Sequence, residues 1–173
     1  EGNGYLTPKR VAQALAEHVS DREAPIMDYG CGTGLSGVAL DEAGFKNIDG
    51  ADLSEKMLDI ARETRVYDKL DLIEPEQDLD RDLDSYDTIV AVGVISKGAA
   101  PPSLYNDLLR VMAPGAKLAF SMNDLSLAED EYNALVPDRV DAGKVKLLHE
   151  EYGPHLTKYG DNSGSKVFVG EKR

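Results

Sequence analysis

The stretch that most constrains this chain runs from Ile26 to Gly34, where an apolar run leads into three glycines at alternate positions. Because glycine has no Cβ, the backbone at Gly30, Gly32 and Gly34 can turn sharply out of a buried strand and approach a ligand closely. A helical pattern begins at Leu35, and the free N–H groups of its first turn would face that ligand. A strand, a glycine loop and a helix in this order predict a nucleoside-cofactor site.

An acidic residue follows the next apolar run. Asp52 ends the apolar run from Ile48 to Leu53, where a carboxylate can accept hydrogen bonds from two ribose hydroxyls. We therefore expect the ligand to contain a ribose.

The glycines fit two cofactors, which make different electrostatic demands. The loop reads G-x-G-x-G, but its last two glycines together with Gly37 also satisfy the dinucleotide pattern G-x-G-x-x-G. A pyrophosphate over the loop would be repelled by Asp28, which stands in the strand itself. S-adenosylmethionine has no phosphate and offers an ammonium for Asp28, a carboxylate for the helix start and a ribose for Asp52. The charges favour S-adenosylmethionine over NAD.

Two motifs carry a family resemblance, Asp28-Tyr-Gly-Cys-Gly-Thr-Gly34 and Gly50-Ala-Asp-Leu-Ser-Glu-Lys-Met-Leu58. They resemble the first two motifs of the class I S-adenosylmethionine-dependent methyltransferases, and segments 65–70, 86–92 and 112–115 continue the resemblance in the family's order. Within the family, the wording Gly-Phe-x-x-Ile-Asp-Gly and Val-Tyr-Asp-Lys-Leu is similar to the group around the Williams-Beuren-region methyltransferase.

The resemblance implies S-adenosylmethionine as cofactor, S-adenosylhomocysteine as product and no metal. Asp28 and the glycine loop would hold the methionine part, Asp52 the ribose, Leu53 and Met57 the adenine faces, and Glu74 the adenine amine. The expected cofactor contacts are Tyr5, Asp28, Gly30, Cys31, Gly32, Thr33, Gly34, Asp52, Leu53, Ser54, Met57, Glu74, Val92 and Gly93.

The alternation of strand and helix patterns predicts a single α/β domain over residues 1–173, with helices on both faces of a parallel sheet. The resemblance makes this a Rossmann-like, doubly wound, seven-stranded sheet with a reversed C-terminal strand hairpin. The expected strands are 26–29, 47–52, 70–73, 87–92, 117–122, 145–152 and 166–170. The expected helices begin at Thr7 as N-cap, Leu35, Ser54, Ser103 and Leu125, and the last of them continues to Val140.

Several features bear on the methyl acceptor. Gly93-Val-Ile-Ser96 stands where relatives that methylate base amines or glutamine amides carry an Asn- or Asp-Pro-Pro-aromatic tetrad. The net charge of −13 without a Lys and Arg cluster argues against a nucleic-acid partner. We therefore expect a small-molecule acceptor. In the loop set Tyr152, His155, Tyr159 and Asp161, His155 is the candidate catalytic base, because imidazole titrates near neutral pH; the alternative is an exposed loop histidine.

The remaining features exclude other chemistries. Cys31 is the only cysteine, so it forms no disulfide within the chain, and we expect it to lend its backbone to the cofactor rather than act as a nucleophile. The acids between Asp68 and Asp87 predict a solvated loop rather than a metal site. No apolar run approaches the roughly 20 residues that span a bilayer, and no signal peptide is recognised, so we expect a cytoplasmic protein without membrane contact.

Two alternatives remain open at this point. The function could instead be that of a non-catalytic S-adenosylmethionine-binding module or, less in keeping with Asp28, of a small NAD(P)-dependent oxidoreductase. Tyr5 has two interpretations as well. It could end an N-terminal segment of the kind that closes over the cofactor in the resembled family, or it could pack beneath the first helix.

Overall fold

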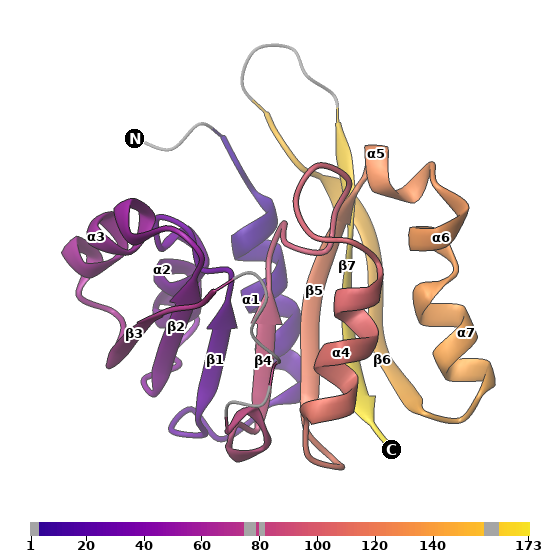
Figure 1. Cartoon of the computed structure of the whole chain (residues 1–173), viewed down its shortest axis with the longest axis horizontal. Helices are drawn as coiled ribbons and strands as arrows, with labels where there is room; N and C mark the ends of the chain where they lie inside the picture. Colours follow the sequence, from indigo (N-terminus) through magenta and orange to yellow (C-terminus); the bar gives the residue numbers. More distant parts are fainter. Residues whose placement is uncertain (1–3, 75–78, 80–81, 158–162) are drawn as a thin grey trace.

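The short apolar runs of the sequence lie side by side as strands of one sheet (Figure 1). The computed structural model describes residues 4–74, 79, 82–157 and 163–173. Within them the strand order is β3-β2-β1-β4-β5-β7-β6. The strands are β1 (Ile26–Tyr29), β2 (Ile48–Asp52), β3 (Lys69–Leu72), β4 (Thr88–Ala91), β5 (Lys117–Asn123), β6 (Val145–Pro154) and β7 (Gly164–Lys172).

The direction of the strands confirms the expected topology. β3, β2, β1, β4 and β5 pair in parallel, while β7 pairs antiparallel with both β5 and β6. The chain thus forms the doubly wound α/β sheet with a reversed C-terminal hairpin. Its strand order changes direction between β1 and β4, which is the place where open α/β sheets bind ligands beyond the carboxyl ends of their strands.

Helices cover both faces of this sheet, as parallel pairing requires. They are α1 (Thr7–His18), α2 (Leu35–Glu42), α3 (Glu55–Thr64), α4 (Ser103–Val111), α5 (Asp124–Leu127), α6 (Asp130–Asn133) and α7 (Leu135–Asp141), with a 3-10 turn η1 (Leu83–Ser85). Figure 1 shows α1 behind the sheet and α4 in front of it. None of the helices in the described part of the chain is both long and apolar enough to cross a membrane.

Alternate residues along the central strands enter two separate apolar cores. In β4, Val90 packs in the core that α1 and α2 cover, whereas Ile89 and Ala91 pack in the core that α4 covers. In β7, Val167 and Val169 belong to the first core and Phe168 to the second. This period of two on a strand that is buried on both faces explains why the sequence showed unbroken apolar runs there.

The predicted single helix from Leu125 to Val140 is wrong. The segment forms the three short helices α5, α6 and α7. Asn123 caps α5 by accepting from the N–H of Ser126. Pro137 then prevents a continuous helix, because proline has no N–H to donate to the carbonyl of Asn133 and its ring would clash with that carbonyl. A new helix therefore starts at Leu135, with Pro137 in its first turn, where proline is tolerated.

The predicted N-cap of α1 is also wrong. Leu6 is the N-cap residue and makes no side-chain capping bond, while Thr7 is the first residue of the helix and is fully buried. The Thr7 hydroxyl is directed to the C-terminal hairpin instead, where it bonds to His155 and Ser165. A long-range contact has replaced the local cap that the sequence suggested.

Candidate active site

The glycine loop leaves β1 at the carboxyl edge of the sheet in a conformation that only glycine adopts easily. Gly30, Gly32 and Gly34 have φ of 74°, 54° and 94°, in the left-handed region. The loop is tied to β2, because the N–H groups of Gly30 and Cys31 donate to the carbonyl of Ala51 at 2.8 and 3.0 Å. Gly34 is the N-cap residue of α2. The loop is therefore a fixed turn that directs the start of α2 toward this edge.

The three glycines differ in what lies over them. A Cβ at Gly30 would lie 2.5 Å from Cγ2 of Val94, so close packing against the segment after β4 demands glycine there. A Cβ at Gly32 would meet nothing within 4 Å. Gly32 thus faces open space, and it is the point where a ligand could lie against the loop backbone.

Asp28 is a fully buried carboxylate at the foot of this loop. Its Oδ2 accepts hydrogen bonds from the hydroxyls of Ser36, at 2.6 Å, and Tyr67, at 2.7 Å. Its Oδ1 is buried and has no hydrogen-bond partner among the residues that the structure describes. Burial raises the pKa of Asp28 to about 6; the bonds from Ser36 and Tyr67 oppose that rise, and the negative charge of Asp52 adds to it. An unsatisfied buried carboxylate oxygen is costly and invites a cationic donor.

Tyr67 is the residue that sequence reasoning missed. Its hydroxyl donates to Asp28 and accepts from the N–H of Gly37 at 3.1 Å. A Cβ at Gly37 would overlap the Tyr67 ring and hydroxyl, and a Cβ at Gly50 would also meet that ring. Packing of Tyr67 therefore explains the glycine at position 37 without a bound phosphate. The only signal in the sequence was that Tyr67 lies in segment 65–70. This segment resembles the family, but no function was assigned to it.

Asp52 ends β2 and holds the loop from the other side. Its Oδ2 accepts from the N–H of Gly32 at 2.9 Å, and its Oδ1 accepts from the N–H of Ser54 at 3.0 Å. A carboxylate has about four acceptor positions, so each oxygen can accept a further donor from a ligand. Asp52 is half-buried, which leaves it open to such a donor.

An apolar surface extends from Asp52 along α3. Leu53 and Met57 have 58% and 42% of their surface exposed, although both are large apolar side chains. Ser54 caps α3 by accepting from the N–H of Met57. Glu74 is exposed and follows β3 by two residues, beyond Ile73, whose N–H donates to the carbonyl of Asp52. This surface at the carboxyl edge suits a flat apolar ring.

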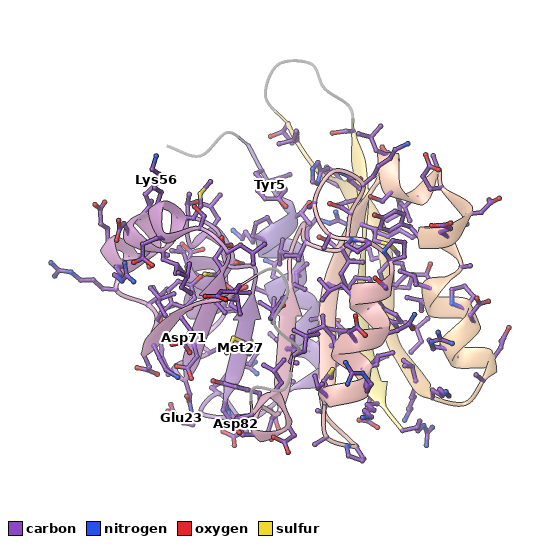
Figure 2. The ribbon with its side chains drawn as sticks, in the orientation of Figure 1. Tyr5, Glu23, Met27, Lys56, Asp71 and Asp82 are labelled. Atoms are coloured by element: carbon purple, nitrogen blue, oxygen red, sulfur yellow. The ribbon has the colours of Figure 1, made fainter. Side chains whose placement is uncertain are left out.

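The other side of the glycine loop is bounded by the end of β4 and the N-terminal segment. Gly93, directly after Val92, has φ of 69°, and a Cβ there would lie 2.9 Å from the Tyr5 hydroxyl. Tyr5 pairs with Leu156 through an isolated bridge, and its ring lies 5.0 Å from that of His155. Burial raises the pKa of Tyr5. Because Tyr5 lies over Gly93, which follows β4, it lies at the carboxyl edge, in the upper part of Figure 2.

Cys31 and Thr33 are the two residues between the glycines of the loop. Cys31 is buried, and Thr33 is half-buried. Burial, followed by the charges of Asp28 and Asp52, raises the pKa of the Cys31 thiol to about 12. A thiol held protonated in this way is a poor nucleophile, which agrees with its interpretation as a backbone contributor.

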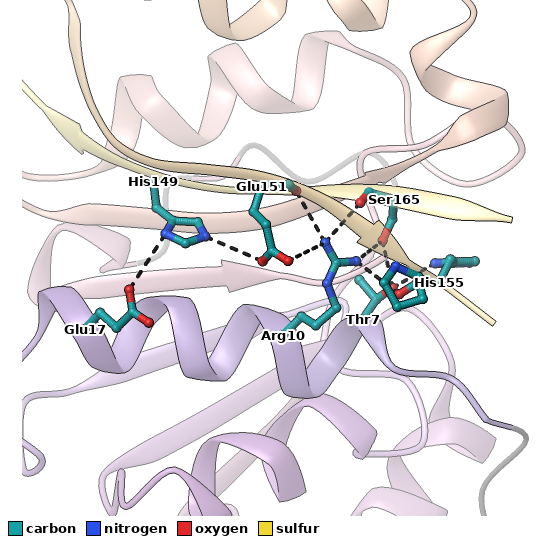
Figure 3. Close-up of polar contacts among 8 residues, drawn as sticks. Thr7, Arg10, Glu17, His149, Glu151, His155 and Ser165 are labelled. Atoms are coloured by element: carbon teal, nitrogen blue, oxygen red, sulfur yellow. Dashed lines mark hydrogen bonds and ion pairs between the residues drawn. The ribbon is translucent and has the colours of Figure 1, made fainter. Parts of the chain in front are cut away.

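The candidate base His155 is held in a polar network between α1 and the C-terminal hairpin (Figure 3). Its Nδ1 lies 2.8 Å from the Thr7 hydroxyl, which lies 2.9 Å from the Ser165 hydroxyl. Ser165 in turn accepts from Arg10 Nη1 at 2.9 Å. His155 is thus half-buried and oriented, not an exposed loop histidine.

Tyr152, the other member of the predicted loop set that the structure describes, is not brought together with His155. Tyr152 donates to Asp124 of α5 at 2.9 Å, whereas His155 contacts Thr7 of α1. These two helices lie on opposite faces of the sheet, so Tyr152 and His155 face away from each other. Tyr159 and Asp161 lie outside the described residues, as do positions 75–78, 80 and 81 of the acidic loop.

A hollow of about 440 Å³ opens at the opposite edge, where the strands begin. It is lined by His18, Tyr86 and Lys117, among others. No part of the glycine loop reaches it, and open α/β sheets bind their ligands at the carboxyl ends of the strands. We therefore assign the candidate site to the glycine-loop edge and not to this hollow.

Comparison with known proteins agrees with that geometry. A family model described as a methyltransferase domain matches residues 4–157. Human methyltransferase-like protein 27 is 31% identical over 114 residues, which are 64% of this chain and 46% of that protein. The ubiquinone biosynthesis O-methyltransferase of Coxiella burnetii is 28% identical over 119 residues, 67% of this chain and 50% of that protein.

A third relative, the 18S rRNA (guanine-N(7))-methyltransferase RID2 of Arabidopsis thaliana, is 30% identical over 144 residues, 77% of this chain and 48% of that protein. The chain spans about half the length of these curated relatives.

A solved structure shares the fold. The magnesium protoporphyrin IX methyltransferase of Synechocystis PCC 6803, crystallised with bound S-adenosylmethionine, superposes with a TM-score of 0.67 at 16% identity, covering 97% of this chain and 78% of that one. The family match favours the G-x-G-x-G interpretation of the loop over the dinucleotide one. From the match over residues 4–157, the chain belongs to the class I S-adenosylmethionine-dependent methyltransferases.

Proposed function

We propose that this chain binds S-adenosylmethionine at the carboxyl edge of β1, β2 and β4 and transfers its methyl group to a small molecule. The observation that carries the proposal is the Asp28 carboxylate, buried beneath the glycine loop with one oxygen unsatisfied among the described residues. The ammonium group of the cofactor, placed beside the loop, would interact electrostatically with this carboxylate and offset part of the cost of burying its charge. A phosphate in the same place would be repelled.

The nucleoside half of the cofactor fits the neighbouring residues. Asp52 would accept from the ribose hydroxyls while it holds Gly32 in place. The exposed side chains of Leu53 and Met57 would cover the faces of the adenine, and burying them would gain about 25 cal/mol per Å². Glu74 would accept from the adenine amine. The remaining proposed contacts are Tyr5, Gly30, Cys31, Thr33, Gly34, Ser54, Val92 and Gly93.

The chemistry asks little more of the chain than positioning. S-adenosylmethionine supplies a methyl group already activated by its sulfonium. The chain must therefore orient the acceptor, exclude water and, where the acceptor carries a proton, remove it. We assign the last role to His155, whose ring lies at the carboxyl edge beside Tyr5 and is oriented by Thr7.

A small-molecule acceptor is supported by charge. A net charge of −13 repels nucleic acid. Among the relatives, the Coxiella protein is named for ubiquinone biosynthesis, whereas the Arabidopsis protein is named for 18S rRNA. RNA is therefore the second candidate acceptor, and it requires a basic surface that the sequence lacks as a cluster. A placement near the Williams-Beuren-region group rests on the motif wording and on the 31% identity to methyltransferase-like protein 27.

The test is methyl transfer from S-adenosylmethionine labelled in its methyl group to separated fractions of a cell extract. We expect label in the small-molecule fraction, with little in protein and RNA. The double variant Asp28→Asn, Asp52→Ala serves as the control for background transfer. Label confined to the RNA fraction would replace the acceptor class, and no label above that control in any fraction would favour a non-catalytic binding module.

A further inference from the structure

The far end of α1 carries a second cluster of ligand-type side chains. Glu17, His18 and His149 each offer one ligand atom, and these atoms all lie within 4.8 Å of one another. Two of the three histidines in the chain are therefore in one place. Thr7 and His18 stand at opposite ends of α1, roughly 16 Å apart at 1.5 Å per residue, so the cluster is separate from the cofactor edge.

His149 reaches this place through an irregularity in β6. Leu147 pairs with Gly170, but His149 pairs with Val169, so one residue, Leu148, is inserted in the register. Leu148 packs in the core that α1 covers. Strict alternation would turn the next side chain to the opposite face, yet His149 also faces α1, as Figure 3 shows. A bulge of this kind redirects a side chain, and here it directs an imidazole toward Glu17.

The two nitrogens of the His149 ring have different surroundings. Nδ1 lies 4.0 Å from Glu17 Oε2, and Nε2 lies 3.7 Å from Glu151 Oε2 (Figure 3). Nε2 is buried and has no hydrogen-bond partner among the described residues. A metal-bound histidine commonly donates its other ring N–H to a carboxylate, which fixes the ring. Nδ1 is thus placed as a ligand, and rotation of the half-exposed Glu151 side chain would bring its carboxylate within hydrogen-bonding distance of Nε2.

Glu17 stands where a carboxylate does not help the helix. It is in the last turn of α1, whose free carbonyls carry partial negative charge, and 68% of its side chain is exposed. A cation between Glu17 and the histidines would reverse that unfavourable interaction. Because the Glu17 side chain is free to rotate, the present separations can contract to metal–ligand bonds of about 2.0–2.2 Å.

We propose that Glu17, His18 and His149 form a binding site for one divalent transition-metal ion of the zinc class, which joins α1 to β6. Two imidazoles and one carboxylate favour Zn²⁺, Co²⁺ or Ni²⁺ over Mg²⁺ and Ca²⁺, which prefer all-oxygen sites. Three protein ligands leave a fourth position for water. His18 also lines the hollow at the amino-terminal edge, which gives the ion a path from solvent.

The test is isothermal titration of the tag-free 173-residue protein with ZnCl₂, and with MgCl₂ for comparison. We expect one equivalent of Zn²⁺ to bind, and His149→Gln and Glu17→Gln each to weaken binding by more than about 100-fold. Glu151→Gln, which removes the orienting charge and also the ion pair of Glu151 with Arg10, should weaken it about 10-fold. His155→Gln and Glu23→Gln are the matched controls, one for each residue type, and should bind as the parent does.

A second measurement separates lost ligands from lost folding. Circular dichroism should show Glu17→Gln folded, because this side chain is exposed. Zn²⁺ should raise the melting temperature of the parent and of His155→Gln but not that of Glu17→Gln. Co²⁺ bound to the parent should give the visible absorption of a four-coordinate site. Glu17→Gln and His149→Gln should not give it. Absence of Zn²⁺ binding by the parent, or equal binding by Glu17→Gln and His149→Gln, would overturn the proposal.

Discussion

At the carboxyl edge of β1 and β2 the polar groups surround an opening, whereas at the same edge of the β6–β7 hairpin they bond to one another. Asp28 has an unsatisfied oxygen and Gly32 faces open space. In the hairpin, by contrast, Tyr152 bonds to Asp124, and His155 bonds to Thr7. A cofactor site can therefore be assigned from its unfinished contacts, while an acceptor site in the hairpin must be inferred from position.

The largest effect is expected for Asp52→Ala. Loss of a carboxylate that accepts two ribose hydrogen bonds should weaken S-adenosylmethionine binding by about 2–4 kcal/mol, given about 1.5–3 kcal/mol for each charged bond and incomplete additivity. Asp59→Ala on α3, where Asp59 is exposed and pairs with exposed Arg62, should bind as the parent. Titration calorimetry measures both. An affinity for Asp52→Ala within threefold of the parent would remove Asp52 from the site.

The pH dependence of stability tests the buried carboxylate at the centre of the comparison. Burial raises the pKa of Asp28 from 3.8 to about 6, so the native state binds the proton more tightly than the unfolded state. The free energy of unfolding should therefore fall as pH rises from about 4 to 6, by about 3 kcal/mol relative to Asp28→Asn, and stay level above that range. Urea unfolding at a series of pH values measures the difference. Parallel curves for the two proteins would mean that Asp28 titrates normally.

His155→Ala tests the proposed base in the hairpin half of the molecule. If His155 is the base, the variant should slow methyl transfer by about 100-fold while S-adenosylmethionine affinity is unchanged. Thr7→Val removes only the hydroxyl that orients the ring, so it should cause a smaller loss of rate. Single-turnover kinetics with labelled cofactor separates binding from transfer. Equal rates for His155→Ala and the parent would leave positioning as the whole catalytic account.

Gly37 and Gly164 allow the rigidity of the two halves of the sheet to be compared. Added methyl groups at Gly37 and Gly164 would overlap the hydroxyls of Tyr67 and Tyr152, respectively. Tyr67 is held by Asp28 and Gly37 in a packed site, so Gly37→Ala should cost about 1–3 kcal/mol of stability. Tyr152 is 59% exposed and can swing aside, so Gly164→Ala should cost less. Chemical denaturation tests this order, and a larger loss for Gly164→Ala would reverse it.

Local sequence patterns predicted most of the fold, because most of its helices and strands begin and end where nearby residues favour it. The apolar runs, the glycines at turns and the cap at Ser54 all place elements within a few residues of where they lie. The failures came from contacts that are distant in sequence or from a single proline. Thr7 gave up its capping role for His155, 148 residues away, and Pro137 separated α7 from α6 in a segment whose apolar period looked continuous.

The candidate site divides in the same way. Asp28, Asp52 and the loop glycines are recognisable because each acts through a short motif. Tyr67 is not, because its function depends on packing against Gly37, 30 residues earlier. The cluster of Glu17 and His149 was likewise hidden, since its members are joined only when a bulge in β6 turns His149 toward α1.

The most direct test of the central claim is calorimetric titration of the parent protein and Asp28→Asn with S-adenosylmethionine and with NAD. We expect the parent to bind S-adenosylmethionine in a one-to-one ratio and not to bind NAD. Asp28→Asn should bind S-adenosylmethionine more weakly, because the ammonium group of the ligand loses a charged partner. Binding of NAD without binding of S-adenosylmethionine would contradict the account, and so would equal affinity of the two proteins for S-adenosylmethionine.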